Sequence, residues 1–119
     1  MANEIQVSIA FQATKNGATA GGTYSGTLTM SGDQLISNVQ IIGTSNEPIT
    51  LGDVTATGVR IMLKNLDATN YVEIFSDSGN ANLISKIPAT EAIYIQPNAA
   101  IYARANTSSV NLLVVAVEA

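Results

Sequence analysis

Hydrophobic and polar residues alternate with a period of two along most of this chain. From Glu4 to Ala13 the odd positions are apolar and the even positions are polar or small, which is the pattern of a strand with one buried face. Similar short segments follow, separated by clusters of Gly, Pro, Asn, Asp and Ser. The further predicted strands are Thr23–Met30, Leu35–Ile42, a short extended piece at Glu47–Asp53, Gly58–Leu66, Tyr71–Phe75, Asn82–Ile87, Ala92–Gln96, Ala99–Ala105 and Val110–Val117.

No segment keeps a helical period of 3.6 residues, so the pattern predicts little or no helix. Many short strands in a chain of this length indicate an all-β fold. We expect one antiparallel β-sandwich domain over residues 1–119, of the jelly-roll type. Lys15, Asn16 and Gly17 form a turn signal, and the first residues together with the Gly-rich segment 15–22 are expected to be flexible.

The last predicted strand is apolar on both faces. Leu112 and Val114 lie on one side, and Leu113, Val115 and Val117 lie on the other. Such a strand either sits centrally in its sheet or meets a neighbouring subunit with its outer face. Leu113, Val115 and Val117 are therefore candidate interface residues.

Composition narrows the possible functions. The 119 residues include no His, Cys or Trp, and 12% are charged, against about 25% in an average globular domain. The surface must therefore be covered by uncharged polar groups or be partly hidden by other subunits. A net charge of −4 with scattered basic residues argues against binding of nucleic acid. Leu112–Val117 is too short an apolar run to cross a membrane, and no signal peptide is recognisable, so we expect synthesis in the cytoplasm.

Acidic residues are the main candidates for chemistry. Asp53, Asp67 and Asp77, with nearby Asn carbonyls, could bind calcium, but their spacing matches no calcium loop, and Asp in turns ordinarily caps backbone N–H groups. Glu73 and Glu91 could be paired acids of a glycosidase, although nothing in the sequence brings them together. No nucleophile elbow or phosphate-binding loop is present. We expect no catalytic residue, no cofactor and no metal, and hence no enzyme.

Two sets of residues could contact a partner. Arg60, Met62 and Lys64 share one face of a predicted strand, either as a patch for an acidic partner or as a solvated face with cross-strand acidic neighbours. Three tyrosines could form a sugar-stacking platform or close a sheet edge or interface. These tyrosines are Tyr71, Tyr94 and Tyr102.

Several segments resemble small structural proteins of tailed-bacteriophage virions. They are the N-terminal sequence Met-Ala-Asn-Glu-Ile-Gln, Leu51–Val54, Lys64–Ile74, the pattern Ile93–Pro97 and Ala99–Ala105, and the apolar last strand. Some proteins of this group are capsid decoration, or cement, proteins. The resemblance covers most of the chain, and its motifs are turns and strands.

The resemblance implies a non-enzymatic protein on the outer surface of an assembled phage head. It would bind the major capsid protein as a homo-oligomer, typically a trimer, with a dimer as the alternative. The parts expected to reach a neighbour are the N-terminus and the loop residues Lys15, Asn16, Gly17, Gly21 and Gly22. The alternative function is a receptor- or glycan-binding module of a tail or fibre.

Overall fold

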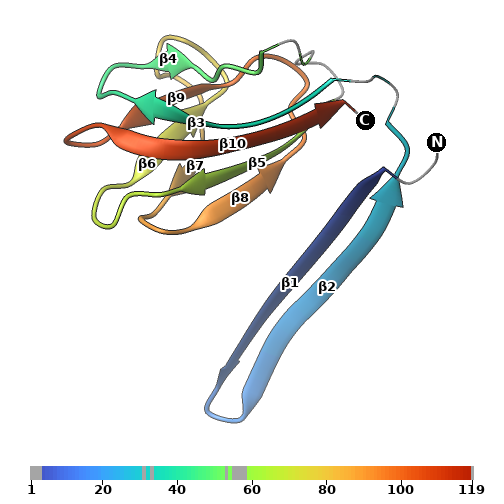
Figure 1. Ribbon diagram of the computed structural model, residues 1–119. Helices are drawn as coiled ribbons and strands as arrows, with labels where there is room; N and C mark the ends of the chain where they lie inside the picture. Colours follow the sequence, from blue (N-terminus) through green and yellow to red (C-terminus); the bar gives the residue numbers. More distant parts are fainter. Residues whose placement is uncertain (1–3, 31, 33, 53, 55–58, 119) are drawn as a thin grey trace. The chain divides into compact units, whose positions relative to one another are not determined.

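The computed structural model describes residues 4–30, 32, 34–52, 54 and 59–118. Within these residues the chain is all-β and antiparallel with no helix, as predicted. The sequence predicts one domain over residues 1–119; the contacts instead group into two compact units, a hairpin and a sandwich (Figure 1). The strands are β1 Ile5–Lys15, β2 Ala18–Leu28, β3 Leu35–Ile42, β4 Glu47–Pro48, β5 Val59–Asn65, β6 Val72–Phe75, β7 Leu83–Ile87, β8 Ala92–Ile95, β9 Tyr102–Ala105 and β10 Val110–Glu118.

The sandwich unit consists of two four-stranded antiparallel sheets. One has the strand order β3-β10-β5-β8 and the other the order β4-β9-β6-β7 (Figure 1). The chain passes from one sheet to the other at nearly every connection, and β6–β7 is the one consecutive pair that shares a ladder. This arrangement of eight strands is compatible with a jelly roll.

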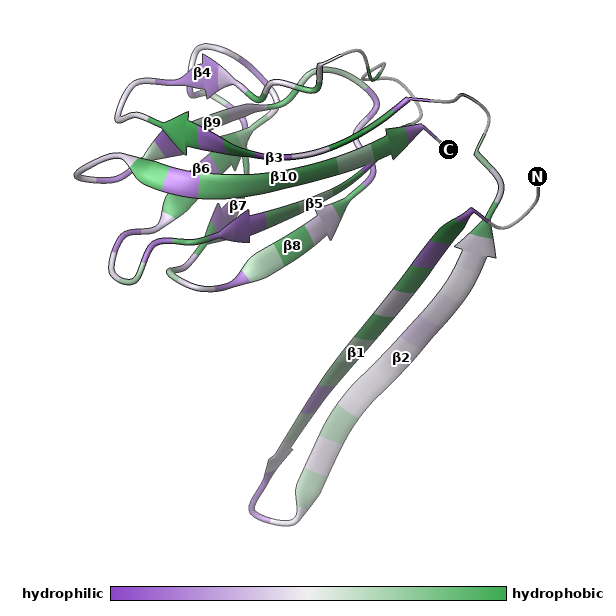
Figure 2. Cartoon of the chain, viewed as in Figure 1, coloured by the Kyte–Doolittle hydropathy of each residue, from purple (hydrophilic) through white to green (hydrophobic). Residues whose placement is uncertain are grey.

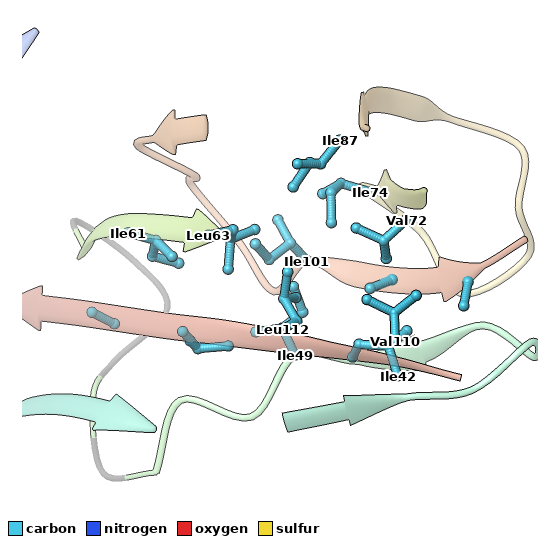
Figure 3. Packing of buried hydrophobic residues seen from close by; sticks show 14 of the residues in the cluster. Ile42, Ile49, Ile61, Leu63, Val72, Ile74, Ile87, Ile101, Val110 and Leu112 are labelled. Atoms are coloured by element: carbon cyan, nitrogen blue, oxygen red, sulfur yellow. The ribbon is translucent and has the colours of Figure 1, made fainter. Parts of the chain in front are cut away.

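The core lies between the two sheets and is almost entirely aliphatic (Figure 3). Alternation along each strand supplies it: in β5, Val59, Ile61 and Leu63 are buried, whereas Arg60 and Lys64 point outward. Every buried residue of this cluster belongs to the sandwich unit. No residue of the hairpin belongs to this cluster.

Strand β10 lies between β3 and β5, so the predicted central position is confirmed. Its residues Leu112, Val114 and Ala116 are fully buried in the core. Leu113 and Val115 are half-buried on the outer face. Pro48 lies in β4, which is an outer strand of its sheet, and a proline there removes no central ladder bond.

Asn65 is the buried polar residue that ties β5 to two neighbouring turns. Its Nδ2 donates toward the carbonyl oxygens of Asn70, Ile87 and Pro88 at 2.8, 3.1 and 3.2 Å, and its Oδ1 accepts a 2.9 Å bond from the N–H of Asp67. The side chain is completely shielded from solvent. Buried backbone groups need such partners because water cannot reach them.

We predict that Asn65→Ala lowers the free energy of unfolding by about 3 kcal/mol, since it leaves buried carbonyl groups without a donor. Urea denaturation followed by circular dichroism measures this change. The matched control is Asn111→Ala on the exposed face of β10, for which a change within about 0.5 kcal/mol is expected. Equal stability of the two variants would show that the Asn65 bonds contribute no net stability.

Candidate assembly surfaces

The hairpin is long, regular and closed by a two-residue turn. Asn16 and Gly17 both have positive φ, 53° and 81°, as a type I′ turn requires. The turn pairs Lys15 with Ala18, and the ladder continues without interruption to Ile5 opposite Leu28. Side chains at Gly17 would meet nothing within 4 Å, so this glycine is required by its φ and not by lack of space.

The predicted flexible loop over residues 15–22 is not what the structure shows. Lys15 ends β1, Asn16 and Gly17 form the turn, and Gly21 and Gly22 are in β2, opposite Gln12 and Phe11. The I′ turn fixes the register, and backbone hydrogen bonds then extend the ladder through residues of low strand propensity. The first three residues, also predicted to be flexible, lie outside the described part of the chain.

One face of the hairpin is apolar apart from Lys15 at its tip, and the other is polar and uncharged. The register places on the first face Ile5, Val7, Ile9, Phe11 and Ala13 of β1 with Ala20, Gly22, Tyr24, Gly26 and Leu28 of β2. The alternation along β1 is visible as bands in Figure 2. The exposed fraction of the Phe11 side chain is 75% and that of Tyr24 is 50%. This apolar face has no core behind it within its own unit.

Lys15, at the tip, is the single charged residue between Ile5 and Leu28. Exposed strands of soluble proteins normally carry charges, prolines or bulges that prevent pairing with other chains. The ladder from Ile5 to Leu28 shows no bulge and contains no proline. A two-stranded ribbon of this kind is marginally stable by itself in water, so the hairpin has the properties of a segment that is covered by a partner.

The two outer faces of the sandwich differ strongly. On the sheet β4-β9-β6-β7, Arg104 forms a 2.8 Å ion pair with Glu73, the Lys86 ammonium lies 4.0 Å from the centre of the Tyr71 ring, and the Arg104 guanidinium lies 5.1 Å from that of Phe75. These cross-strand contacts satisfy the charges of the face. Such a face is suited to contact with water.

The outer face of the sheet β3-β10-β5-β8 is mostly apolar. On β3 the exposed fractions are 61% for Leu35, 52% for Val39 and 66% for Ile41. These side chains adjoin the outer face of β10, because Leu35 pairs with Val117 and Val39 with Leu113. The outer residues shared by this pair of strands, which we call the β3–β10 strip, are Leu35, Ser37, Val39, Ile41, Asn111, Leu113, Val115 and Val117.

The candidate interface residues of the last strand therefore all lie on one surface. Leu113, Val115 and Val117 are outside the sandwich core and half-buried by their neighbours. Whether a partner covers them stays a prediction. Two signals in the sequence point further than the predictions drawn from them. The alternating apolar residues of β3 extend the surface, and the Asn16-Gly17 turn signal is typical of a full hairpin.

Arg60, Met62 and Lys64 do share the outer face of β5, as predicted. Their partners across the ladder are apolar: Met62 pairs with Val115 and Tyr94, and Lys64 pairs with Leu113 and Ala92. The cross-strand neighbours of Met62 and Lys64 are therefore not acidic. This strand continues the apolar surface and carries basic residues at its margin.

The predicted sugar-binding tyrosines are spread over different surfaces. Tyr94 points outward beside Met62 on the sheet β3-β10-β5-β8. Tyr102 belongs to β9 in the other sheet, and Tyr71 is engaged by Lys86. They do not form one stacking platform.

Asp67 and Asp77 cap turns. Asp67 accepts hydrogen bonds from the N–H groups of Thr69 and Asn70 at 3.0 and 2.6 Å. Asp77 accepts from the N–H groups of Gly79, Ala81 and Asn82. Asp53, the third acid of the calcium hypothesis, lies outside the described residues. Over the part that the structure describes, no three His, Cys, Asp or Glu side chains are grouped as a metal would require.

Glu73 and Glu91, the candidate glycosidase acids, do not line the hollow that the structure shows. Glu73 is paired with Arg104 on an outer sheet face, and Glu91 is exposed in the turn before β8. A hollow of about 500 Å³ lies along the hairpin, lined by Gln6, Val7, Ser8, Ser25, Gly26 and Thr27, none of which titrates near neutral pH. No helix among the described residues is long and apolar enough to cross a membrane. No known family model matches the chain, and no curated protein matches it.

Backbone N–H bonds hold the pKa of the Asp77 carboxyl below its ordinary value, first those from Asn82 and Ala81. A folded-state pKa below the unfolded value stabilises the fold above the unfolded pKa, and this stability is lost as the pH falls through the folded pKa. We predict that Asp77→Asn has a lower Tm than the natural protein at pH 7 and that the difference shrinks below about pH 4. Thermal denaturation of both proteins at several pH values measures this difference in Tm.

The control for the aspartate variant is Glu91→Gln, which removes the same charge from an exposed side chain that caps no turn. Its Tm should follow that of the natural protein across the pH series. A Tm difference for Asp77→Asn that persists unchanged at low pH would mean that the carboxylate charge is not what stabilises the turn.

Proposed function

We propose that this protein is a non-enzymatic virion structural protein that decorates the outer surface of an assembled phage head. In this role it binds the major capsid protein as a homo-oligomer and stabilises contacts between capsid subunits. The observation that carries the proposal is the hairpin: 24 residues with one charge and an exposed apolar face, outside the core of the sandwich. The virion setting rests on the resemblance of the sequence segments.

Assembly on a repeating lattice suits these features. A decoration protein acts by binding the assembled shell and not the free subunits, so that mass action favours the assembled state. One small sandwich offers limited contact area, but several copies joined together bind many equivalent sites at once, which multiplies the affinity. The hairpin supplies a means of joining copies without using the sandwich core.

The jelly-roll type of sandwich is compatible with this role and does not require it, because one fold carries many functions. Several features favour assembly over catalysis. The charged groups of the outer sheet β4-β9-β6-β7 are engaged with one another, and the capping aspartates Asp67 and Asp77 are engaged with backbone N–H groups. Exposed apolar side chains remain on the hairpin and on β3.

The alternative is a receptor- or glycan-binding module of a tail or fibre. It would use single aromatic residues, such as the half-buried Tyr94, and not a platform of several, since Tyr102 lies on the other sheet. Cryo-electron microscopy of particles produced by the genome that encodes this chain separates the two. Density repeating over the head supports decoration, whereas density at the tail or fibre alone supports the alternative.

A shortened hairpin tests the decoration role. Deleting residues 8–15 and 18–25 removes eight ladder pairs, including Ile9, Phe11 and Tyr24 of the apolar face, while keeping the Asn16-Gly17 turn and the register of Val7 with Gly26. We predict that this variant keeps the circular-dichroism spectrum and Tm of the sandwich but occupies particles about tenfold less at equal concentration, because multivalent binding is lost. Quantitative gel analysis of purified particles measures the occupancy.

The matched control is Ile84→Glu, which changes an exposed apolar residue of β7 away from both apolar surfaces. It should leave the occupancy unchanged. Full occupancy by the shortened variant would contradict a role of the hairpin in decoration.

A further inference from the structure

We infer that the apolar face of the hairpin packs on the β3–β10 strip of a second copy of this chain. Each copy would donate one hairpin and receive one. The inference concerns how copies join one another, goes beyond the decoration role and holds in solution without a capsid. It accounts for the two apolar surfaces of the chain with one contact.

The two surfaces match in chemistry. The apolar face of the hairpin carries no charge from Ile5 to Ala13 or from Ala20 to Leu28, and the β3–β10 strip carries none either. If the partner were a different protein, the two surfaces of this chain would not need to be alike in charge. Lys64 lies at the margin of the strip and not within it.

The two surfaces also match in size. The hairpin is two strands wide with eleven ladder pairs, and the strip is two strands wide with eight. Stacked sheets bury alternate side chains of both faces between them, as β-sandwiches do. A hairpin lying along the strip would repeat that arrangement outside the core.

The area reaches what a specific interface requires. Strand spacing and rise give a contact about 30 Å long and about 10 Å wide, or about 300 Å² on each of the two surfaces. Two reciprocal contacts bury about 1,200 Å² in total, at the lower end of the range for stable protein complexes. A single contact would bury about 600 Å², which falls short. The estimate therefore requires two copies to exchange hairpins with each other, which closes a two-fold dimer.

Exposed aromatic and aliphatic side chains supply the anchors. Phe11 projects beside Gly22, which has no side chain to cover it, and Tyr24 lies over Gly26, where a Cβ would clash with its phenol ring. The opposing strip offers Val39 and Ile41, both more than half exposed. Aromatic anchors at the centre of a contact usually contribute most to affinity.

Photo-cross-linking identifies the occupant directly. The probe is the full chain with p-benzoylphenylalanine in place of Phe11, mixed as ¹⁴N and ¹⁵N copies before irradiation. We expect mixed-isotope cross-links from position 11 to peptides of β3 or β10. Cross-links within one chain, cross-links between two hairpins, or a protein that stays monomeric without cross-links to the strip would each overturn the inference.

Paired variants provide a second test that does not depend on the probe. Phe11→Glu and Val39→Glu should each raise the dissociation constant of the oligomer about a hundredfold, measured by light scattering across a dilution series. Their controls are Gln12→Glu on the polar face of the hairpin and Ile84→Glu on β7. Both controls should leave the dissociation constant unchanged. Dissociation by Phe11→Glu alone, with Val39→Glu still fully assembled, would show that the strip is not the receiving surface.

Failure of this inference and failure of the decoration role are distinguishable. The cross-linking and dilution experiments use purified protein without particles. Decoration is read from density and occupancy on particles.

Discussion

A two-stranded ribbon cannot bury its own apolar face, and this constraint governs the hairpin from Ile5 to Leu28. A sheet gains stability when one of its faces packs against another layer. The sandwich achieves this by packing two sheets around an aliphatic core that contains no residue of the hairpin. The hairpin has regular pairing but no second layer within its own unit, and we propose that a second copy of the chain supplies this layer.

The two units therefore have different roles in the protein. The sandwich is a complete fold, with its charges paired on one outer face and Asn65 satisfying the turns at the end of β5. The hairpin is incomplete and nearly uncharged. A stable module with an incomplete extension is a suitable building block, because its assembly does not require any change in the core. The β3–β10 strip gives the extension a surface of matching width and chemistry.

Alternation along the chain predicted the strands of the sandwich closely. Leu35–Ile42 is found as predicted, and the ends of β5, β6, β7 and β10 lie within one or two residues of their predicted positions. These strands each bury one face, so their hydrophobic pattern follows the pleat. The second strand of the hairpin was predicted to begin five residues too late, because Ala18–Gly22 has small side chains with low strand propensity and is held by backbone pairing.

The candidate site was harder to predict than the fold. Leu113, Val115 and Val117 were identified because their strand is apolar on both faces, and the structure places them outside the core. The contribution of Val39 and Ile41 could not be read from the sequence, since it depends on which strand pairs with β10. Lys15 and Asn16 were predicted to lie at a turn within a flexible segment, and the structure places them at a tight turn between two long strands, where Lys15 pairs with Ala18.

The central claim is that the hairpin acquires its second layer from another copy of the chain. Amide hydrogen exchange followed by mass spectrometry over a range of protein concentrations tests this most directly. If the claim is correct, protection of the β1 and β2 amides rises with concentration, whereas protection of the β5 and β10 amides stays high throughout. Protection of the hairpin that is the same at every concentration would contradict it.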